Sequence, residues 1–406
     1  IITNFSIMAQ LQLIFFFVTG FLVSRVVVKT HLPQKLVYLL MGRSHNSISI
    51  TVLYLIGTAA IMSLFIPNAI TMLTLLPVLD LLSKSFQKDQ SSQIPTMLTL
   101  AVLYGANIGG MGTITGTPTN LALVAYLGAY NIPNSAGITF FNWMLWGIPL
   151  VILLALLSWL LLCLGFKAWY SNANQQIYMP YVPNETEHFI QSYAWGIIIF
   201  YIVSAGLLSF LLSMLPDYGL VILVLTGLIT ISFTWLLFWY PVTGGQPILE
   251  LKDTYSNLPK KGLELLGIVL ILGGILYFLD LQIWFANQLS NFIPHNISPF
   301  GFVLTIALIT TFSTELLSNT LVQLAMFLII LPLAQNIGLP PIQVLLVVTL
   351  SCTCAFMSPI ATPVNALAFG GTQNMSLMRF MGIGAIMNIL GSVFITFYVL
   401  NFVQIG

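Results

Sequence analysis

Two short stretches of the chain share a pattern that could bind a ligand inside a membrane. They are Gly-Thr-Pro-Thr-Asn at 116–120 and Ala-Thr-Pro-Val-Asn at 361–365, and each interrupts a long apolar segment. In both, a Thr stands where a helix N-cap is favoured and a Pro stands at the first helical position. The pattern predicts a break followed by a second half-helix that begins at Pro118 or Pro363. Because such a break is tolerated only where it is buried in protein or lines a cavity, its repetition indicates the binding site of a secondary transporter.

Two asparagines extend the pattern to two further stretches. The apolar stretches 47–84 and 299–335 are too long for one span, and each carries a polar interruption near its middle, at Asn68 and Asn319. We expect each stretch to be a re-entrant hairpin whose second helix begins at the Asn; two ordinary spans joined by a tight loop are the simpler alternative. Four helix N-termini would then meet near the bilayer midplane. Their unpaired N–H groups and positive dipole ends suit an anion without any Lys or Arg.

The same turns offer oxygens for a cation. Unwound backbone carbonyls, together with Ser, Thr and Asn oxygens, suit a hard cation such as Na⁺. The candidate sodium ligands are Ser63, Asn68, Gly116, Thr314, Asn319 and Ala361. A cation beside the anion would offset its charge, so we expect the two to bind together. The alternative is that these polar residues only cap broken helices, but two matching breaks at midplane are costly to keep without a use.

The composition indicates that the protein lies in a lipid bilayer, and it argues against several classes of protein. Hydrophobic residues make up 58% of the chain and charged residues 5%, which indicates a polytopic protein that spans a lipid bilayer. The formal net charge of +1 gives no attraction for nucleic acid. There is no nucleophile–base pair and no metal-ligand cluster, which argues against a membrane enzyme. The three cysteines lie in apolar segments and suggest neither a metal site nor a disulfide, so no cofactor is expected beyond a transported Na⁺.

The hydrophobic segments and basic residues predict a topology. Spans are expected at 5–29, 94–130 (broken), 139–166, 189–214, 219–241, 263–287, 341–375 (broken) and 379–403. With residue 1 outside and neither hairpin crossing, all eleven Lys and Arg residues fall on the cytoplasmic side. We therefore expect an integral, multi-pass protein of the plasma (inner) membrane. Trp143 and Trp146 are expected in an interfacial aromatic belt.

The order of segments repeats with opposite orientation. A span, a polar elbow, a hairpin, a broken helix and a further span occur once from residue 5 and again from residue 263. This order predicts an all-α polytopic membrane protein built from two inverted repeats, each with a re-entrant hairpin and a broken transmembrane helix. Two spans precede the second repeat and none precedes the first, and the chain begins with Ile1. We therefore expect that N-terminal spans are missing.

Three motifs resemble a known family. They are Ile-Gly-Gly-Met-Gly-Thr-Ile-Thr-Gly-Thr-Pro-Thr-Asn at 108–120, Thr-Glu-Leu-Leu-Ser-Asn-Thr at 314–320 and Cys-Ala-Phe-Met-Ser-Pro-Ile-Ala-Thr-Pro-Val-Asn-Ala at 354–366. They are similar to those of the divalent anion:sodium symporters, which carry dicarboxylates, citrate or sulfate, and the likeness covers nearly the whole chain. The resemblance implies a homodimer, a scaffold, and a transport domain that moves like an elevator. The substrate-binding residues proposed from the pattern and this resemblance are Asn68, Thr117, Pro118, Ser318, Asn319, Thr320, Thr362 and Pro363.

The resemblance also implies a division of the chain. Residues 1–46 would form a scaffold span and cytoplasmic elbow, and residues 47–138 the first half of the transport domain, with a cytoplasmic hairpin at 47–84 and a broken helix at 94–130. Residues 139–298 would be connecting spans, mostly scaffold. Residues 299–375 would form the second half of the transport domain, with an extracellular hairpin at 299–335 and a broken helix at 341–375. Residues 376–406 would form the last span.

One hairpin tip departs from the family pattern, and one further polar residue lies beside the other tip. The first tip is Pro67-Asn68-Ala69, where the family usually has Ser-Asn-Thr, and each hydrogen bond lost to a charged ligand would cost about 1.5–3 kcal/mol unless the ligand differs. Glu315 is an intramembrane carboxylate, for which we favour a structural hydrogen-bonding role over a proton or sodium role.

These observations favour one function. The chain is expected to couple uptake of a small anion, a di- or tricarboxylate or sulfate, to Na⁺. The alternatives are an anion exchanger, or a sodium/proton antiporter or arsenite-type permease of the wider ion-transporter group.

Overall fold

The computed structural model describes most of the chain. It covers residues 2–30, 32, 47–85, 93–130, 132–168, 185–255, 275, 279 and 298–404. The span expected at 263–287 and the polar elbows that follow it and the span at 5–29 lie almost wholly outside the described residues. So does most of the segment between the spans expected at 139–166 and 189–214. Both expected hairpins and both expected broken helices lie within the described ranges.

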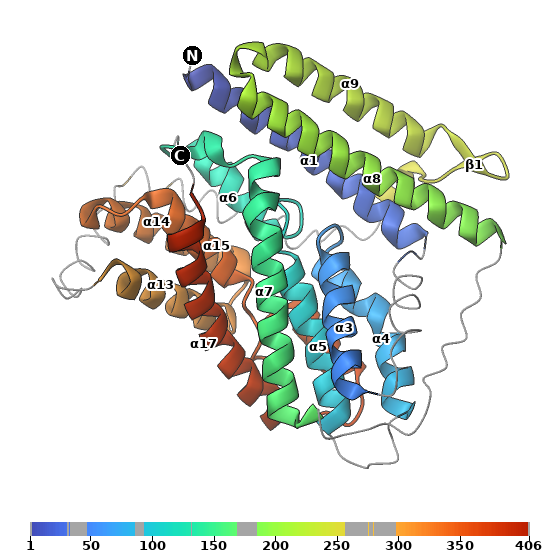
Figure 1. Ribbon diagram of the computed structural model, residues 1–406, viewed down its shortest axis with the longest axis vertical. Helices are drawn as coiled ribbons and strands as arrows, with labels where there is room; N and C mark the ends of the chain where they lie inside the picture. Colours follow the sequence, from blue (N-terminus) through green and yellow to red (C-terminus); the bar gives the residue numbers. More distant parts are fainter. Residues whose placement is uncertain are drawn as a thin grey trace. The chain divides into compact units, whose positions relative to one another are not determined.

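The described part is almost entirely helical, which confirms the predicted all-α class (Figure 1). Its helices are α1 (Ile2–Lys29), α3 (Ile48–Ser63), α4 (Asn68–Ser85), α5 (Gln93–Gly109), α6 (Pro118–Ala129), α7 (Phe140–Phe166), α8 (Glu185–Met214), α9 (Gly219–Phe238), α10 (Leu251–Tyr255), α13 (Pro299–Thr314), α14 (Asn319–Ile337), α15 (Pro341–Cys352), α16 (Pro363–Gly371) and α17 (Leu377–Phe402). Two 3₁₀ turns, η1 (Ser135–Gly137) and η3 (Pro216–Tyr218), precede α7 and α9. A two-stranded antiparallel hairpin, β1 (Pro241–Thr243) and β2 (Gln246–Pro247), turns at Gly244 and Gly245, which both have positive φ.

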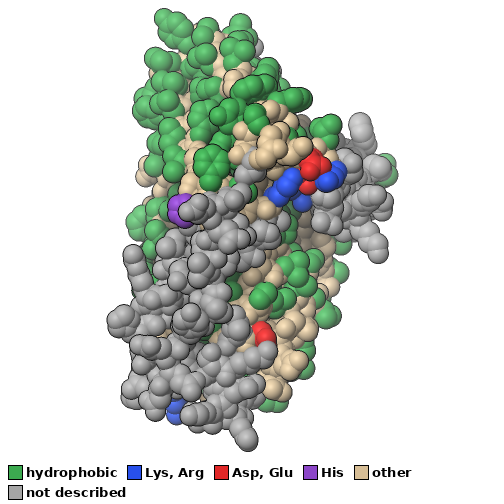
Figure 2. All heavy atoms as spheres, turned by 90° about the vertical axis from the view of Figure 1, so that its right-hand side faces the viewer, with side chains coloured by type: hydrophobic (Ala, Val, Ile, Leu, Met, Phe, Trp, Pro, Cys, Tyr) green, Lys and Arg blue, Asp and Glu red, His purple; other side chains and the backbone are tan. Residues whose placement is uncertain are grey.

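The lengths and surfaces of these helices fit a membrane protein. Four segments in the described part are long and apolar enough to cross a bilayer: Phe140–Phe166, His188–Met214, Pro216–Phe238 and Leu377–Phe402. The first hairpin helix, α3, has 16 residues and is about 24 Å long at 1.5 Å per residue, short of the roughly 30 Å hydrocarbon core. Such a length fits a hairpin that turns back. On the face drawn in Figure 2 the described side chains are mostly hydrophobic, and the charged ones gather at few places.

The chain divides into two compact units, which we describe separately. The first contains Ile1–Thr117, Ile138–Ser256 and Leu367–Ser376. Within it, α1 packs against α8 and α9, and all three lie side by side in Figure 1. Two buried hydrogen bonds join them: Gln12 Nε2 donates to Thr226 Oγ1 at 3.2 Å, and Tyr201 Oη donates to the Phe16 carbonyl at 3.1 Å.

The helices around the first break pack unusually closely. Helix α5 lies between α3, α4 and α7, and glycines allow its backbone to approach that of α3. A Cβ atom at Gly109 would clash with the Ala60 carbonyl oxygen, and one at Gly105 would lie 2.8 Å from Ala59 Cβ. Small residues at helix interfaces permit this close approach, which membrane helices use in place of hydrophobic attraction.

The second unit contains Pro118–Gly137, Asn257–Ala366 and Leu377–Gly406. In it, α15 packs against α6, α13, α14 and α17. The interface of α13, α15 and α17 is partly polar: Thr311 Oγ1 lies 3.0 Å from Ser392 Oγ and donates to the Ser351 carbonyl at 3.3 Å. The second half of the first broken helix, α6, therefore belongs to the unit that holds the second hairpin.

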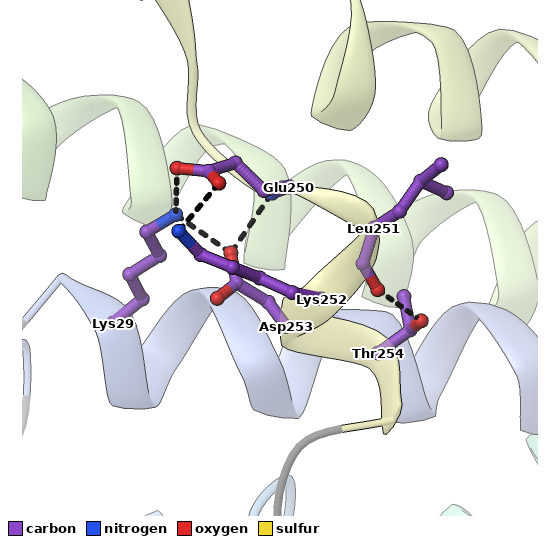
Figure 3. Close-up of polar contacts among 6 residues, drawn as sticks. All are labelled: Lys29, Glu250, Leu251, Lys252, Asp253 and Thr254. Carbon is purple, nitrogen blue, oxygen red and sulfur yellow. Dashed lines mark hydrogen bonds and ion pairs between the residues drawn. The ribbon is translucent and has the colours of Figure 1, made fainter.

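A cluster of charges joins the end of α1 to α10 (Figure 3). Lys29 Nζ lies 2.6 Å from Asp253 Oδ2 and 4.0 Å from Glu250 Oε1, and Lys252 Nζ lies 2.7 Å from Glu250 Oε2. The Glu250 amide also donates to Asp253 Oδ2 at 2.8 Å. Lys29 and Lys252 thus lie together, as expected of two residues placed on the same side of the membrane by the charge pattern.

This cluster should make a small, pH-dependent contribution to stability. Partial burial would raise the pKa of Asp253, but the Glu250 amide, Lys29 and Lys252 outweigh it and hold the pKa below its usual value. The contribution is therefore present at neutral pH and is lost as the pH falls through the folded-state pKa. We expect Lys29→Met to lower the free energy of unfolding by less than about 1 kcal/mol at neutral pH, because exposed pairs contribute little. Thermal unfolding of the wild type and of Lys29→Met, measured from neutral pH down through the pKa of Asp253, checks this prediction. If the stability difference between the two proteins did not shrink on acidification, the prediction would be wrong.

Candidate functional site

The predicted breaks and hairpin tips are present in the structure. Helix α6 begins at Pro118 and α16 at Pro363, and α4 and α14 begin at Asn68 and Asn319. Non-helical segments 110–117 and 353–362 precede α6 and α16. The expectation of interrupted helices, with these four residues as helix starts, is therefore confirmed.

In the first unit, Asn68 and Thr117 meet at Gly110. A Cβ atom at Gly110 would clash with Thr117 Cγ2 and would lie 3.0 Å from Asn68 Oδ1. Asn68 Nδ2 donates to Asn107 Oδ1, on α5, at 3.2 Å. The glycine therefore brings the hairpin tip against the end of the break, and the bond to Asn107 fixes the direction in which the Asn68 amide points.

The rest of the first break is held by backbone contacts. A Cβ atom at Gly116 would clash with the Gly110 carbonyl oxygen, so the two ends of the segment touch. Thr113 Oγ1 donates to the Leu64 carbonyl at 2.7 Å, which ties the break to the hairpin turn. Trp143 Nε1 donates to the Met111 carbonyl at 2.9 Å. The interfacial position expected for Trp143 is wrong: the indole is fully buried because its N–H satisfies a carbonyl that the break leaves without a helical partner.

Ser63 is buried in the same unit, at the end of α3. Its hydroxyl donates to Thr71 Oγ1 at 2.9 Å, so the two helices of the hairpin are bonded just below the tip. The Ser63 oxygen keeps lone pairs that could coordinate a cation.

In the second unit, Asn365 holds the second break from inside α16. Its Nδ2 donates to the carbonyls of Ala355 at 3.0 Å and Ser358 at 2.8 Å. Thr362 Oγ1 donates to Asn365 Oδ1 at 2.6 Å and accepts from the Asn365 amide at 3.3 Å. Thr362 is therefore the N-cap that the sequence predicts.

Glu315 holds the same break from the end of α13. Its Oε1 accepts from the Met357 amide at 2.8 Å and from Asn388 Nδ2 at 2.6 Å, and its Oε2 accepts from the Ser358 amide at 2.6 Å. Asn388 Oδ1 accepts in turn from the Phe356 amide at 3.2 Å. These three hydrogen bonds are all donated to Glu315, and the residue is 1% exposed, which fits a structural role. The predicted hydrogen-bonding role of Glu315 agrees with this geometry.

The second hairpin tip leaves oxygens available. Ser318 is exposed and Asn319 and Thr320 are half-buried, whereas Thr314 is buried and donates to the Thr311 carbonyl at 2.8 Å. Within the described part of the chain, Asn319 Oδ1 is buried and accepts no hydrogen bond. An acceptor in this state suits a cation or a donor supplied by a ligand.

The second unit also places α6 beside α14. Gln323, one turn beyond Asn319, donates through Nε2 to the Thr119 carbonyl at 2.8 Å, in the first turn of α6. The helix starts at Pro118 and Asn319 therefore lie on helices that are bonded to each other near their N-termini.

The candidate residues divide between the two units. The first unit holds Ser63, Asn68, Gly116 and Thr117; the second holds Pro118, Thr314, Ser318, Asn319, Thr320, Ala361, Thr362 and Pro363. Of the His, Cys, Asp and Glu residues that the structure describes, none form a group of three that could hold a metal ion. The oxygens at these positions are thus neutral carbonyls, amides and hydroxyls, which suit a weakly held alkali cation. The residues that position them, and for which the sequence alone indicated no such role, are Asn107, Gly110, Trp143, Gln323, Asn365 and Asn388.

Comparison with known proteins assigns the family. Residues 9–404 match the family described as the sodium:sulfate symporter transmembrane region. The chain belongs to this family. It is therefore an integral, multi-pass membrane transporter of a sodium-coupled anion symporter family, and not an enzyme.

The chain is also similar to individual transporters. It is 25% identical over 402 residues to the sodium-dependent dicarboxylate transporter SdcS of Staphylococcus saprophyticus, a match that covers 96% of this chain and 76% of that protein. It is 25% identical over 352 residues to the human Na(+)/dicarboxylate cotransporter 3, covering 77% of this chain and 57% of that one. Its fold resembles the crystal structure of the YdaH transporter of Alcanivorax borkumensis, with a TM-score of 0.62 and 13% identity over 98% of this chain and 87% of that one.

Proposed function

We propose that this chain couples uptake of a small anion, a di- or tricarboxylate or sulfate, to Na⁺. One observation carries the proposal: in the second unit three helices begin at residues that the sequence pattern predicts, Pro118, Asn319 and Pro363, and none of these starts carries a Lys or Arg. Helix N-termini offer N–H donors and a positive dipole end to an anion. A binding site without a full positive charge can also release the anion to the other side of the membrane.

The site residues follow from this proposal. Asn68, Thr117, Pro118, Ser318, Asn319, Thr320, Thr362 and Pro363 would bind the anion. Ser63, Asn68, Gly116, Thr314, Asn319 and Ala361 would bind Na⁺. The unpartnered Asn319 Oδ1 supports the second sodium site, because a buried acceptor without a donor costs about 1–3 kcal/mol and a cation would satisfy it. The sodium-dependent dicarboxylate transporters among the relatives support both the ion and the class of substrate.

We further propose that two inverted repeats move the site by an elevator motion in a homodimer. The order of elements supports the repeat: α3, α4, α5, α6 and α7 are followed by α13, α14, α15, α16 and α17, each set comprising a hairpin, a broken helix and a long helix. Gly147 of α7 approaches the first break, since a Cβ atom there would lie 2.9 Å from the Gly112 carbonyl oxygen. Gly384 of α17 approaches the second break at the Phe356 carbonyl in the same way.

The antiporter alternative gains no support from Glu315. A proton carrier must take up and release a proton in turn, whereas the oxygens of this carboxylate accept three hydrogen bonds from donors that fix the break.

Uptake into proteoliposomes tests the proposal. Labelled succinate, citrate and sulfate would be offered with and without an inward Na⁺ gradient, and we expect at least one anion to accumulate only with the gradient. Asn319→Ala is expected to abolish that uptake without a change in thermal stability. Asn401→Ala, an exposed Asn of α17, is the matched control and should transport normally. If none of the three anions enters under either condition, or if Asn319→Ala transports as well as the wild type, the proposal is wrong.

A further inference from the structure

A buried amide links two of the helix starts assigned to the anion. Gln323 is fully buried on α14, and its Nε2 donates to the Thr119 carbonyl at 2.8 Å and to Thr349 Oγ1, on α15, at 3.0 Å. Thr349 Oγ1 donates its own proton to the Leu345 carbonyl at 2.8 Å, so it must accept from Gln323. Both partners are acceptors, which fixes the orientation of the amide without ambiguity.

Packing alone does not explain a Gln at this buried position. In the described part of the chain, Gln323 Oε1 is buried and has no hydrogen-bond partner. An unsatisfied buried carbonyl is destabilising, and a Met of similar length would fill the same space without leaving such an oxygen. The side chain is therefore explained by what its N–H groups hold.

The bond to Thr119 joins α6 and α14 close to their N-terminal ends. Thr119 lies in the first turn of α6, directly after Pro118, and Gln323 lies one turn into α14, after Asn319. The side chains at positions i and i+4 lie on one face of a helix, so Gln323 and Asn319 face the same side. A change in the Gln323 bond would therefore shift the N-terminus of α6 relative to that of α14.

We propose that Gln323 is a positioning residue that sets the spacing between the N-termini of α6 and α14, and thereby the length of dianion that the transporter selects. The inference rests on the proposed function, in which both N-termini bind the anion. A dicarboxylate with its two charges several atoms apart is bound at both helix starts and is sensitive to their separation. Sulfate, whose charges share one centre, is much less so.

Kinetics of a matched pair of variants test this role. Gln323→Met keeps length and volume but removes both donors, so the Thr119 bond is lost. Thr349→Val removes only the second acceptor and keeps the bond to Thr119. We expect Gln323→Met to raise KM for succinate at least fivefold at saturating Na⁺, with kcat and KM for sulfate changed less than twofold. Thr349→Val should remain within twofold of the wild type for both anions.

Binding is measured beside uptake so that the two proposals can fail separately. Thermal shifts of the purified protein with succinate, glutarate and sulfate give affinities that do not depend on transport. Absence of both uptake and shifts in the wild type would reject the proposed function. An equal loss for all anions in Gln323→Met, or an equal effect of Thr349→Val, would overturn the spacing role. Gln323→Leu is made in parallel, and failure of both Gln323 variants to fold would assign the residue to the core and equally overturn it.

Discussion

Glu315→Ala is expected to lower the free energy of unfolding by about 3–5 kcal/mol and to abolish uptake, because three buried donors lose their acceptor at about 1–3 kcal/mol each. Those donors are the amides of Met357 and Ser358 and the Asn388 side chain. Removing the carboxylate also relieves its desolvation, which keeps the net loss below the sum of the three. Since a typical protein has only about 5–15 kcal/mol of stability, a change of this size is easily measured by thermal unfolding in detergent.

A charge exchange separates this interpretation from a general packing defect. In Glu315→Gln the side-chain amide would place a donor against the Ser358 or Met357 N–H group, so that variant should also be weakened. Adding Asn388→Asp returns a carboxylate that can accept from the new Gln amide and from the Phe356 amide, as Asn388 Oδ1 does now. We expect the double variant to recover part of the lost stability. Glu250→Ala, at an exposed carboxylate, is the control and should change little; a Glu315→Ala protein as stable as this control would contradict the assignment.

Apolar side chains contact the first break at two positions where the second break is contacted by polar side chains. In the first unit, Leu64 and Val151 both crowd Gly112: a Cβ atom there would clash with Leu64 Cδ2 and lie 3.2 Å from Val151 Cγ2. In the second unit, Glu315 follows Thr314 just as Leu64 follows Ser63 in the first. Asn388 lies one turn after Gly384, just as Val151 lies one turn after Gly147. At these positions, therefore, apolar side chains pack against the first break, whereas a carboxylate and an amide form hydrogen bonds to the second. Electrostatic perturbations at these positions should therefore act mainly on the proposed ligands of the second unit.

The local signals of the site were all readable from the sequence. Thr-Pro and Asn are typical of helix starts, and the predicted starts at Pro118, Pro363, Asn68 and Asn319 are confirmed. The all-α class likewise follows from composition, because a polypeptide in lipid must satisfy its backbone polar groups within each segment or in a closed barrel.

The residues that hold these helix starts and breaks in place do so through contacts between segments that are distant in sequence. Gln323 contacts Thr119 across 204 positions, and Asn388 contacts Glu315 across 73. Periodicity within a segment cannot pair such residues. Trp143 illustrates the resulting error: a Trp near the start of an apolar span is typical of an interfacial belt, yet its partner, Met111, exists only because the broken helix leaves a carbonyl exposed nearby.

Gly116→Ala is expected to abolish sodium-dependent uptake and to destabilise the protein by about 1–3 kcal/mol or more, the range typical of overpacking. The added methyl would clash with the Gly110 carbonyl oxygen and lie 3.0 Å from the Gly110 Cα, so backbone rather than a flexible side chain must move. Gly110 is also the residue against which Asn68 and Thr117 lie, so its displacement would reach both proposed ligands. Uptake and thermal unfolding would be measured on the same preparation.

Gly57→Ala in α3 provides the matched comparison for Gly116→Ala. Apart from its chain neighbours and the backbone of its own helix, no atom lies within 4 Å of a Cβ built at Gly57, so the substitution should be tolerated and should add up to about 1 kcal/mol of helix propensity. If Gly116→Ala retained uptake while Gly57→Ala lost it, the close approach of Gly110 and Gly116 would not shape the first half of the site. The clash is between the added Cβ and the backbone of Gly110 at the other end of the break, so a conservative Ser at position 116 should be as damaging as Ala. The size of the side chain beyond Cβ is therefore irrelevant, and only a residue without Cβ lets the chain close on itself beside Asn68.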